Sequence, residues 1–89
     1  MAANGKTVNE RIRSFVLDKF PLARKRGVKD SDELLKSGIV DSLGVLDLVG
    51  FLENEFGLQV SDDDLLPQNF HSIESMVRFA KERKTADEP

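Results

Sequence analysis

The residues best suited to chemistry lie in one short stretch, Gly38-Ile39-Val40-Asp41-Ser42-Leu43. Asp41 suits the N-cap of a helix, and Ser42 then falls at the first helical position. The N-terminus of a helix has unpaired backbone N–H groups and partial positive charge, so it favours a phosphate group. The sequence therefore predicts that the Ser42 hydroxyl is exposed at a helix start, where a phosphodiester would be stabilised.

No catalytic group accompanies this serine. The 89 residues include no cysteine and a single histidine, His71, which we expect at the surface. These counts exclude disulfides, cysteine nucleophiles and metal sites built from several histidines. The triplet Asp62-Asp63-Asp64 lacks the alternating ligands and central glycine of a calcium-binding loop. We therefore predict neither an enzyme nor a metal-binding protein.

Composition and charge bound the kind of protein. With 39% hydrophobic and 33% charged residues, the chain reads as one soluble domain, which we expect to be a cytoplasmic monomer without a membrane span or signal segment. Residues 1–29 carry a net charge of +6, residues 30–64 carry −9, and residues 65–89 carry zero. The acidic middle segment argues against nucleic acid and for a basic protein partner.

Hydrophobic spacing indicates the elements that position Ser42. Thr7 and Glu10 form a capping box, and the apolar residues after them predict a first helix over residues 7–20, which Pro21 ends. Residues 21–40 are predicted to form a long connection with one helical turn at residues 31–35. A connection this long is unusual in a small domain and is often functional. The apolar residues expected to pin it to the core are Leu34, Leu35, Ile39 and Val40.

The second helix is predicted over residues 42–56, because apolar residues recur on one face and Gly57 follows as a stop. A short third helix is predicted near residues 62–66, ended by Pro67, and a fourth over residues 73–84 after the capping Ser72. We therefore predict an all-α four-helix bundle with three main helices, one short third helix and a long loop between helices 1 and 2. The domain covers residues 7–84, between a flexible N-terminus at 1–6 and a flexible tail at 85–89.

The stretch Asp41-Ser42-Leu43 resembles the acyl carrier protein family, whose signature is Asp-Ser-Leu at the start of the second helix. The resemblance covers residues 34–79. Glu53-Asn54-Glu55-Phe56-Gly57 is similar to the acidic end of that family's second helix, and Asn69-Phe70-His71-Ser72-Ile73 is similar to the entry into its last helix. The resemblance implies an acyl-carrier-like bundle.

By this resemblance, Ser42 is the attachment point of a 4'-phosphopantetheine arm, which a phosphopantetheinyl transferase takes from coenzyme A. Asp41 and Leu43 flank the attachment point, and Asp41 is also an acidic contact for partner enzymes. The thiol of the arm carries an acyl or aminoacyl group as a thioester. It supplies the reactive sulfur that a chain without cysteine lacks.

The second helix is predicted to dock the partner enzymes, which would be acyl-activating enzymes, acyltransferases or synthases. Leu43 and Leu46 are the apolar docking candidates, and Asp47 and Glu53 are the acidic ones. The alternatives are that the acidic residues form an ordinary solvated face and that Leu43 folds back over the preceding loop. Three further residues are assigned to the core or to the border of an acyl pocket: Val45, Phe70 and Ile73.

The sequence departs from the family pattern at several positions. Gly44 stands where many relatives have an acidic residue, and we expect it to allow close approach to the arm. Asn54 interrupts the acidic end of the second helix. The first connection carries a basic cluster, which is either a solvated loop or a second contact site: Arg24, Lys25, Arg26 and Lys29.

These departures favour a carrier in a specialised lipid, polyketide or related biosynthetic pathway over one for housekeeping fatty-acid synthesis. The alternative function is a non-enzymatic helical interaction module without a prosthetic group. In that case Ser42 is an ordinary first-turn serine.

Overall fold

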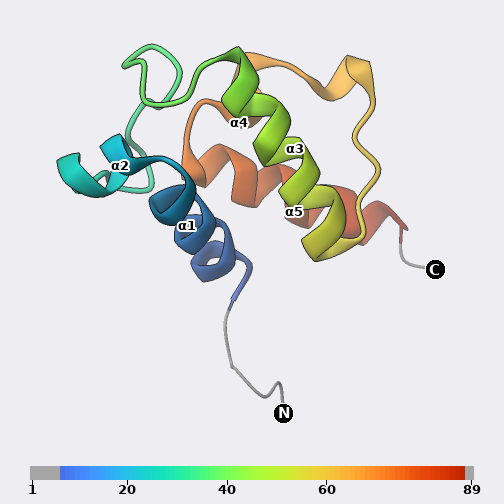
Figure 1. Cartoon of the computed structure of the whole chain (residues 1–89). Helices are drawn as coiled ribbons and strands as arrows, with labels where there is room; N and C mark the ends of the chain where they lie inside the picture. Colours follow the sequence, from blue (N-terminus) through green and yellow to red (C-terminus); the bar gives the residue numbers. More distant parts are fainter. Residues whose placement is uncertain (1–6, 88–89) are drawn as a thin grey trace.

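The computed structural model of the chain describes residues 7–87, and these fold into helices joined by turns (Figure 1). The α-helices are α1 (Val8–Lys19), α2 (Pro21–Arg26), α3 (Ser42–Phe56), α4 (Pro67–Phe70) and α5 (Ile73–Asp87), with one 3₁₀ turn, η1 (Asp62–Asp64). Within residues 7–87 there is no β-strand, so the predicted all-α class is confirmed.

The first helix begins and ends as its sequence predicts. The Thr7 hydroxyl accepts a hydrogen bond from the Glu10 N–H at 3.1 Å, and the Glu10 carboxylate accepts one from the Thr7 N–H at 2.9 Å. This reciprocal pair is the capping box. The helix ends at Phe20, whose extended backbone precedes Pro21.

The connection predicted over residues 21–40 is not entirely irregular, because its first six residues form α2. Pro21 begins this helix at a position where its missing N–H costs no hydrogen bond, and Gly27 ends it with a positive φ of 61°. The basic cluster therefore lies largely on a helix rather than in a loop. Its first three members occupy the last turn of α2, where the negative end of the helix dipole favours cations.

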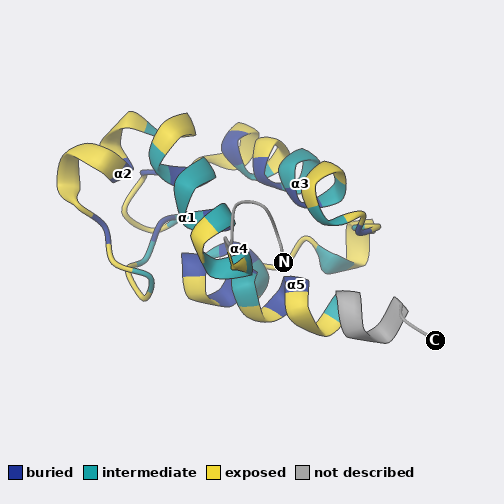
Figure 2. Cartoon of the chain, turned by 90° about the horizontal axis from the view of Figure 1, so that it is seen from below, coloured by how far each residue is buried: buried dark blue, intermediate teal, exposed yellow. Residues whose placement is uncertain are grey.

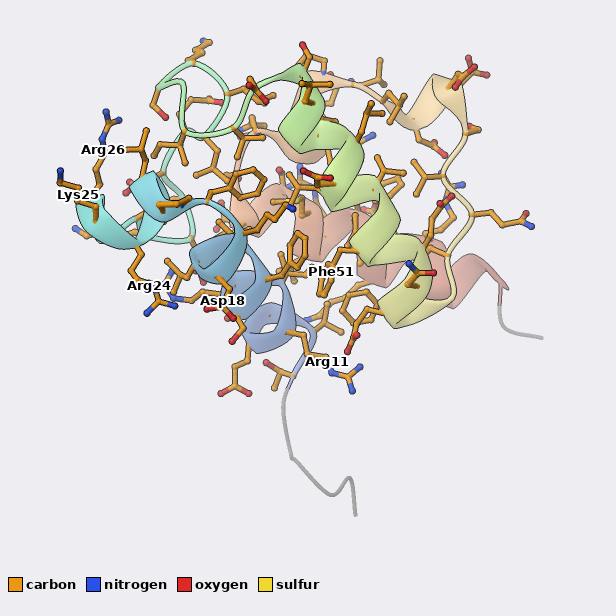
Figure 3. The ribbon with its side chains drawn as sticks, in the orientation of Figure 1. Arg11, Asp18, Arg24, Lys25, Arg26 and Phe51 are labelled. Atoms are coloured by element: carbon orange, nitrogen blue, oxygen red, sulfur yellow. The ribbon has the colours of Figure 1, made fainter. Side chains whose placement is uncertain are left out.

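Figure 3 shows how these basic side chains lie. Arg24 reaches back to Asp18 of α1, with a guanidinium nitrogen 2.6 Å from a carboxylate oxygen. Lys25 and Arg26 point away from the rest of the molecule (Figure 3). The remainder of the connection, residues 27–40, consists of turns, and the helical turn predicted at 31–35 is not formed there.

The segment between α3 and α5 contains two short helical elements, η1 and α4, where one short helix was predicted. The expected third helix at residues 62–66 is only the three-residue turn η1, capped by Ser61. This turn ends at Asp64, before Pro67, so the prediction that Pro67 ends it is wrong; Pro67 instead begins α4 at the first helical position. Two buried serines open α5, because the Ser72 hydroxyl accepts from the Ser75 N–H and the Ser75 hydroxyl from the Ser72 N–H.

Helix α5 continues to Asp87, three residues beyond the predicted domain end at 84. The predicted flexible segment at residues 1–6 and the last two residues of the predicted tail lie outside the described residues.

The core forms where α1 and α3 lie over α5 (Figures 1 and 2). Its fully buried side chains come from all three helices: Ile12, Val16, Leu48, Leu52, Ile73 and Met76. Phe51 of α3 stacks on Phe15 of α1, with ring centroids 4.2 Å apart. Leu34, Ile39 and Val40 are buried too, so the long connection is pinned to the core as predicted. This pinning fixes the backbone that leads into Ser42.

Candidate functional site

Ser42 is the first residue of α3, and its side chain is exposed. Asp41 caps the helix, because its carboxylate accepts a hydrogen bond from the Gly44 N–H at 2.8 Å. The N–H groups of the first turn have no acceptors within a helix. The first turn also contains no acidic residue. The Ser42 hydroxyl therefore lies at a helix N-terminus whose partial positive charge favours a phosphate group.

A groove opens beside Ser42. It has a volume of about 480 Å³, which lies within the range of small-ligand pockets. One side is formed by α3 and the loop before it, and the other by the segment around α4. Its lining residues are Leu35, Val40, Asp41, Ser42, Val45, Leu46, Leu65, Leu66, Pro67 and Phe70. The groove combines an apolar lining with one exposed hydroxyl.

Two of the three residues assigned to the core or acyl pocket line this groove. Val45 is half-buried on α3, and Phe70 is a buried residue at the end of α4. Ile73 is fully buried and does not line the groove. Its place in the structure is therefore the core beneath the site.

The apolar pair on α3 is exposed. Leu43 is 72% exposed and Leu46 is 58% exposed, so Leu43 does not fold back over the preceding loop. Leu46 also forms part of the groove rim. Large apolar side chains this exposed, next to a reactive hydroxyl, suit contact with a partner surface.

The acidic residues of α3 already have partners within the chain. Asp47 lies 3.7 Å from the Lys19 ammonium, and Glu55 lies 3.3 Å from the Arg11 guanidinium. Glu53 is half-buried and accepts a hydrogen bond from the Val60 N–H at 3.1 Å. Glu53 therefore holds the backbone that leaves α3, whatever it also does at the surface.

Gly44 faces the interior of the protein, contrary to the prediction that it makes room for the arm. A Cβ atom there would lie 2.8 Å from Phe20 Cε1 and 3.0 Å from a Val40 methyl carbon. These contacts are too short for ordinary packing. Glycine therefore lets the first turn of α3 approach the end of α1, which is a packing requirement.

The remaining candidates lie away from the groove. His71 is half-exposed, and its Nδ1 is 3.5 Å from a Glu33 carboxylate oxygen. In the described part of the chain, no three His, Cys, Asp or Glu side chains are grouped so as to hold a metal ion. Nor is any helix of residues 7–87 long and apolar enough to cross a membrane.

Sequence reasoning did not find the far wall of the groove. Leu65 and Leu66 are 37% and 42% exposed and precede Pro67. The sequence feature that could have indicated this wall is the pair of adjacent leucines directly after three aspartates. These leucines do not belong to an apolar helix face that packs in the core, so they are candidates for a surface groove. Leu35 was assigned to core pinning, but it is only half-buried and lines the groove.

The chain is similar to known carrier proteins over most of its length. Residues 10–80 match the family model described as a phosphopantetheine attachment site. A probable acyl carrier protein, PigG, from a Serratia species is 27% identical over 81 residues, covering 91% of this chain and 93% of the relative. A D-alanyl carrier protein from Streptococcus uberis is 30% identical over 80 residues, covering 90% of this chain and 99% of the relative.

The match to the family model spans most of the chain, and both relatives align over nearly their whole length. Both relatives are named as carrier proteins, which is consistent with a role other than catalysis. The match to a phosphopantetheine attachment site favours a carrier over an interaction module without a prosthetic group. The chain belongs to the acyl carrier protein family, and its prosthetic group is 4'-phosphopantetheine.

Proposed function

We propose that the protein carries an acyl or aminoacyl group as a thioester on a phosphopantetheine arm attached to Ser42. The observation that carries the proposal is the exposed Ser42 hydroxyl at the first position of α3, at the mouth of the apolar groove. A phosphodiester formed there lies in the favourable field of a helix N-terminus. When attached, the arm supplies the thiol that the cysteine-free chain lacks.

The groove is suited to shielding the acyl part of the cargo. Val45, Leu66 and Phe70 offer apolar side chains from both walls. Burying a methylene group is favourable by roughly 0.8 kcal/mol, so several groups of an acyl chain would hold it in the groove. A thioester held against these walls is less accessible to water until a partner enzyme draws the arm out.

Partner enzymes dock on the exposed face beside Ser42. Leu43 and Leu46 provide the apolar contact, Asp41 and Asp47 provide negative charge at its edge, and Glu53 contributes the part of its carboxylate not committed to Val60. The first partner is a phosphopantetheinyl transferase that uses coenzyme A. The later partners are enzymes that activate, transfer or condense the acyl group.

The pathway is a specialised one, with enzymes dedicated to this carrier. Two features of α3 support a specialised pathway. Gly44 stands where many relatives have an acidic residue, and the carboxylates of α3 form ion pairs or hydrogen bonds within the chain. A relative that is a probable acyl carrier protein and another that is a D-alanyl carrier protein are both compatible with acyl or aminoacyl cargo. A gene lying within a core fatty-acid synthesis cluster would contradict this assignment.

Intact mass spectrometry tests the attachment. Unmodified protein is incubated with coenzyme A and a phosphopantetheinyl transferase of broad specificity, and we expect the gain of one phosphopantetheine. Ser42→Ala should abolish the gain. Ser31→Ala, which changes another exposed serine, should leave it intact. No gain by the unsubstituted protein would overturn the proposed function, and a gain by Ser42→Ala would overturn the assignment to Ser42.

A further inference from the structure

The far wall of the groove belongs to a segment that is weakly packed. Residues 57–66 link α3 to α4 and pass along the outside of the molecule (Figure 1). Leu58 is the buried apolar residue of this segment, whereas Leu65 and Leu66 are partly exposed and η1 buries no residue. Leu58 and the partly buried Val60 attach this segment to the core, but the leucines of the wall are not themselves buried.

Polar contacts centred on Asp64 also hold the segment. One Asp64 carboxylate oxygen accepts hydrogen bonds from the Ser61 N–H at 3.0 Å and the Ser61 hydroxyl at 3.1 Å. The other lies 2.6 Å from a guanidinium nitrogen of Arg83. The Asp64 carbonyl accepts from the Asn69 side chain at 2.8 Å, which joins η1 to α4.

Arg83 anchors this assembly to α5. Its second guanidinium nitrogen reaches the Gln59 carbonyl at 3.4 Å, and the guanidinium lies over the Phe79 ring, 5.1 Å from the centroid. The Asp64 side chain is only 15% exposed and that of Arg83 is 32% exposed, so solvent screens this pair less than an open surface pair. The Ser61 backbone hydrogen bond and the Arg83 side chain lower the pKa of Asp64, so its carboxylate is charged at neutral pH.

The position of the two groove walls thus depends on different forces. Val45 and Leu46 stand on α3, which is fixed by buried Leu48 and Leu52. Leu65 and Leu66 directly follow Asp64 in the chain, so the contacts of the Asp64 carboxylate hold the backbone from which the leucine wall begins. Charge-assisted hydrogen bonds of this kind are about twice as strong as neutral ones.

We infer that Asp64 and Arg83 are positioning residues that set the width of the groove beside Ser42, and through it the size of acyl group that the carrier shields. The inference rests on the proposed function, because only a cargo held in the groove makes its width matter. Neither residue lines the groove, so each acts through the leucine wall. Loosening the wall should expose long acyl groups and leave the shortest ones unaffected.

The test compares wild type with Asp64→Asn, Arg83→Gln and the double variant. Asp18→Asn is the matched control, because the Asp18–Arg24 pair has the same 2.6 Å separation but lies away from the groove. Each protein is loaded with acyl groups of graded length from the corresponding acyl-coenzyme A, and intact mass follows cleavage of the thioester by hydroxylamine. Circular dichroism and thermal unfolding confirm that each variant is folded.

We expect the longest acyl groups shielded by wild type to be cleaved roughly tenfold faster in Asp64→Asn, corresponding to loss of one charged hydrogen bond. Acetyl cleavage and the Asp18→Asn profile should match wild type. The effect of the double variant should be smaller than the sum of the two single effects, because both single variants remove the Asp64–Arg83 contact. Amide exchange of Leu65 and Leu66, measured without any arm, should also be faster in both single variants.

The possible outcomes distinguish failure of the positioning role from failure of the proposed function. If every protein loads and the cleavage profiles and amide exchange are unchanged, the positioning role is wrong while the proposed function stands. If no protein gains the arm, the proposed function fails and the cargo part of the inference fails with it. If Asp64→Asn does not fold, Arg83→Gln decides, since its side chain is partly exposed and contributes little to the core.

Discussion

Gly44 and Phe20 approach so closely that a single methyl group between them would lie 2.8 Å from the Phe20 ring. The contact joins the first turn of α3 to the C-terminal end of α1. The start of the helix that bears Ser42 is therefore set by close packing from beneath. The absence of a side chain at residue 44 lets the first turn of α3 pack close to the Phe20 ring.

Gly44→Ala is expected to destabilise the protein, although alanine is the better helix former. Alanine gains roughly 0.5–1 kcal/mol from helix propensity, but overpacking against the ring costs roughly 1–3 kcal/mol. Chemical denaturation should show a net loss of about 1 kcal/mol. Gly50→Ala is the matched control on the same helix, because nothing lies within 4 Å of a Cβ atom there. That variant should gain stability, and an equal gain at both positions would contradict the packing argument.

Two roles of Asp41, as the N-cap of α3 and as a negative charge for partner enzymes, can be distinguished by substitution. Asp41→Ala removes the hydrogen bond to the Gly44 N–H and should lower the free energy of unfolding by about 1 kcal/mol. Asp41→Asn keeps the cap and should retain most of that stability. If partner enzymes use the charge, both variants should be modified more slowly by the transferase. Equal stability of Asp41→Ala and wild type in denaturant would show that the cap is energetically unimportant.

Leu43→Ala should weaken partner binding without weakening the fold. At 72% exposure the side chain buries little area, so stability should change by less than about 0.5 kcal/mol. The kcat/KM of the transferase should fall, because a large exposed apolar anchor is lost from the docking face. Leu22→Ala provides the control, since Leu22 is exposed on α2, outside the docking face. Similar kcat/KM values for the two variants would argue against docking through Leu43.

Asp64 should make the stability of the protein sensitive to acid. Its pKa is lowered in the folded protein, chiefly by the Ser61 backbone hydrogen bond and then by Arg83. The stabilisation is therefore fully present above the ordinary aspartate pKa of about 3.9 and disappears as pH falls through the lowered value. Wild type should exceed Asp64→Asn in thermal stability at neutral pH, and the two melting temperatures should converge as the solution is acidified below about pH 4. A difference that stays constant down to about pH 3 would contradict this role.

The helices that contain a strong periodic pattern could be predicted, and the short ones could not. Thr7 and Glu10 marked the start of α1, and Gly57 the end of α3, because capping depends on neighbouring residues alone. Pro21 and Pro67 were understood as the ends of helices. Only Pro21 directly follows the end of the preceding helix, whereas η1 ends before Pro67. Each proline begins a new short helix, which depends on the chain direction that tertiary packing imposes.

The site itself was predicted only in part. Ser42 and Asp41 lie where the helix-start argument puts them, since that argument is local. The groove forms because Leu65 and Leu66 lie across from Val45. This arrangement joins residues far apart in the sequence, so a local sequence pattern does not predict it. The same holds for Gly44, because the atom that forbids a side chain there comes from Phe20, far back in the sequence.

The ion pairs between α1 and α3 bear on how fast partners find the carrier. Lys19 and Arg11 lie beside Asp47 and Glu55, so a cation from outside meets carboxylates whose field is already partly cancelled. Electrostatic steering depends on the uncompensated field and weakens as ionic strength rises. The association rate of this carrier with its enzymes should therefore fall less with rising ionic strength than it would if Asp47 and Glu55 had no cationic neighbours. Recognition in a crowded cell then depends on the fit of the leucine surface after contact, more than on attraction from a distance.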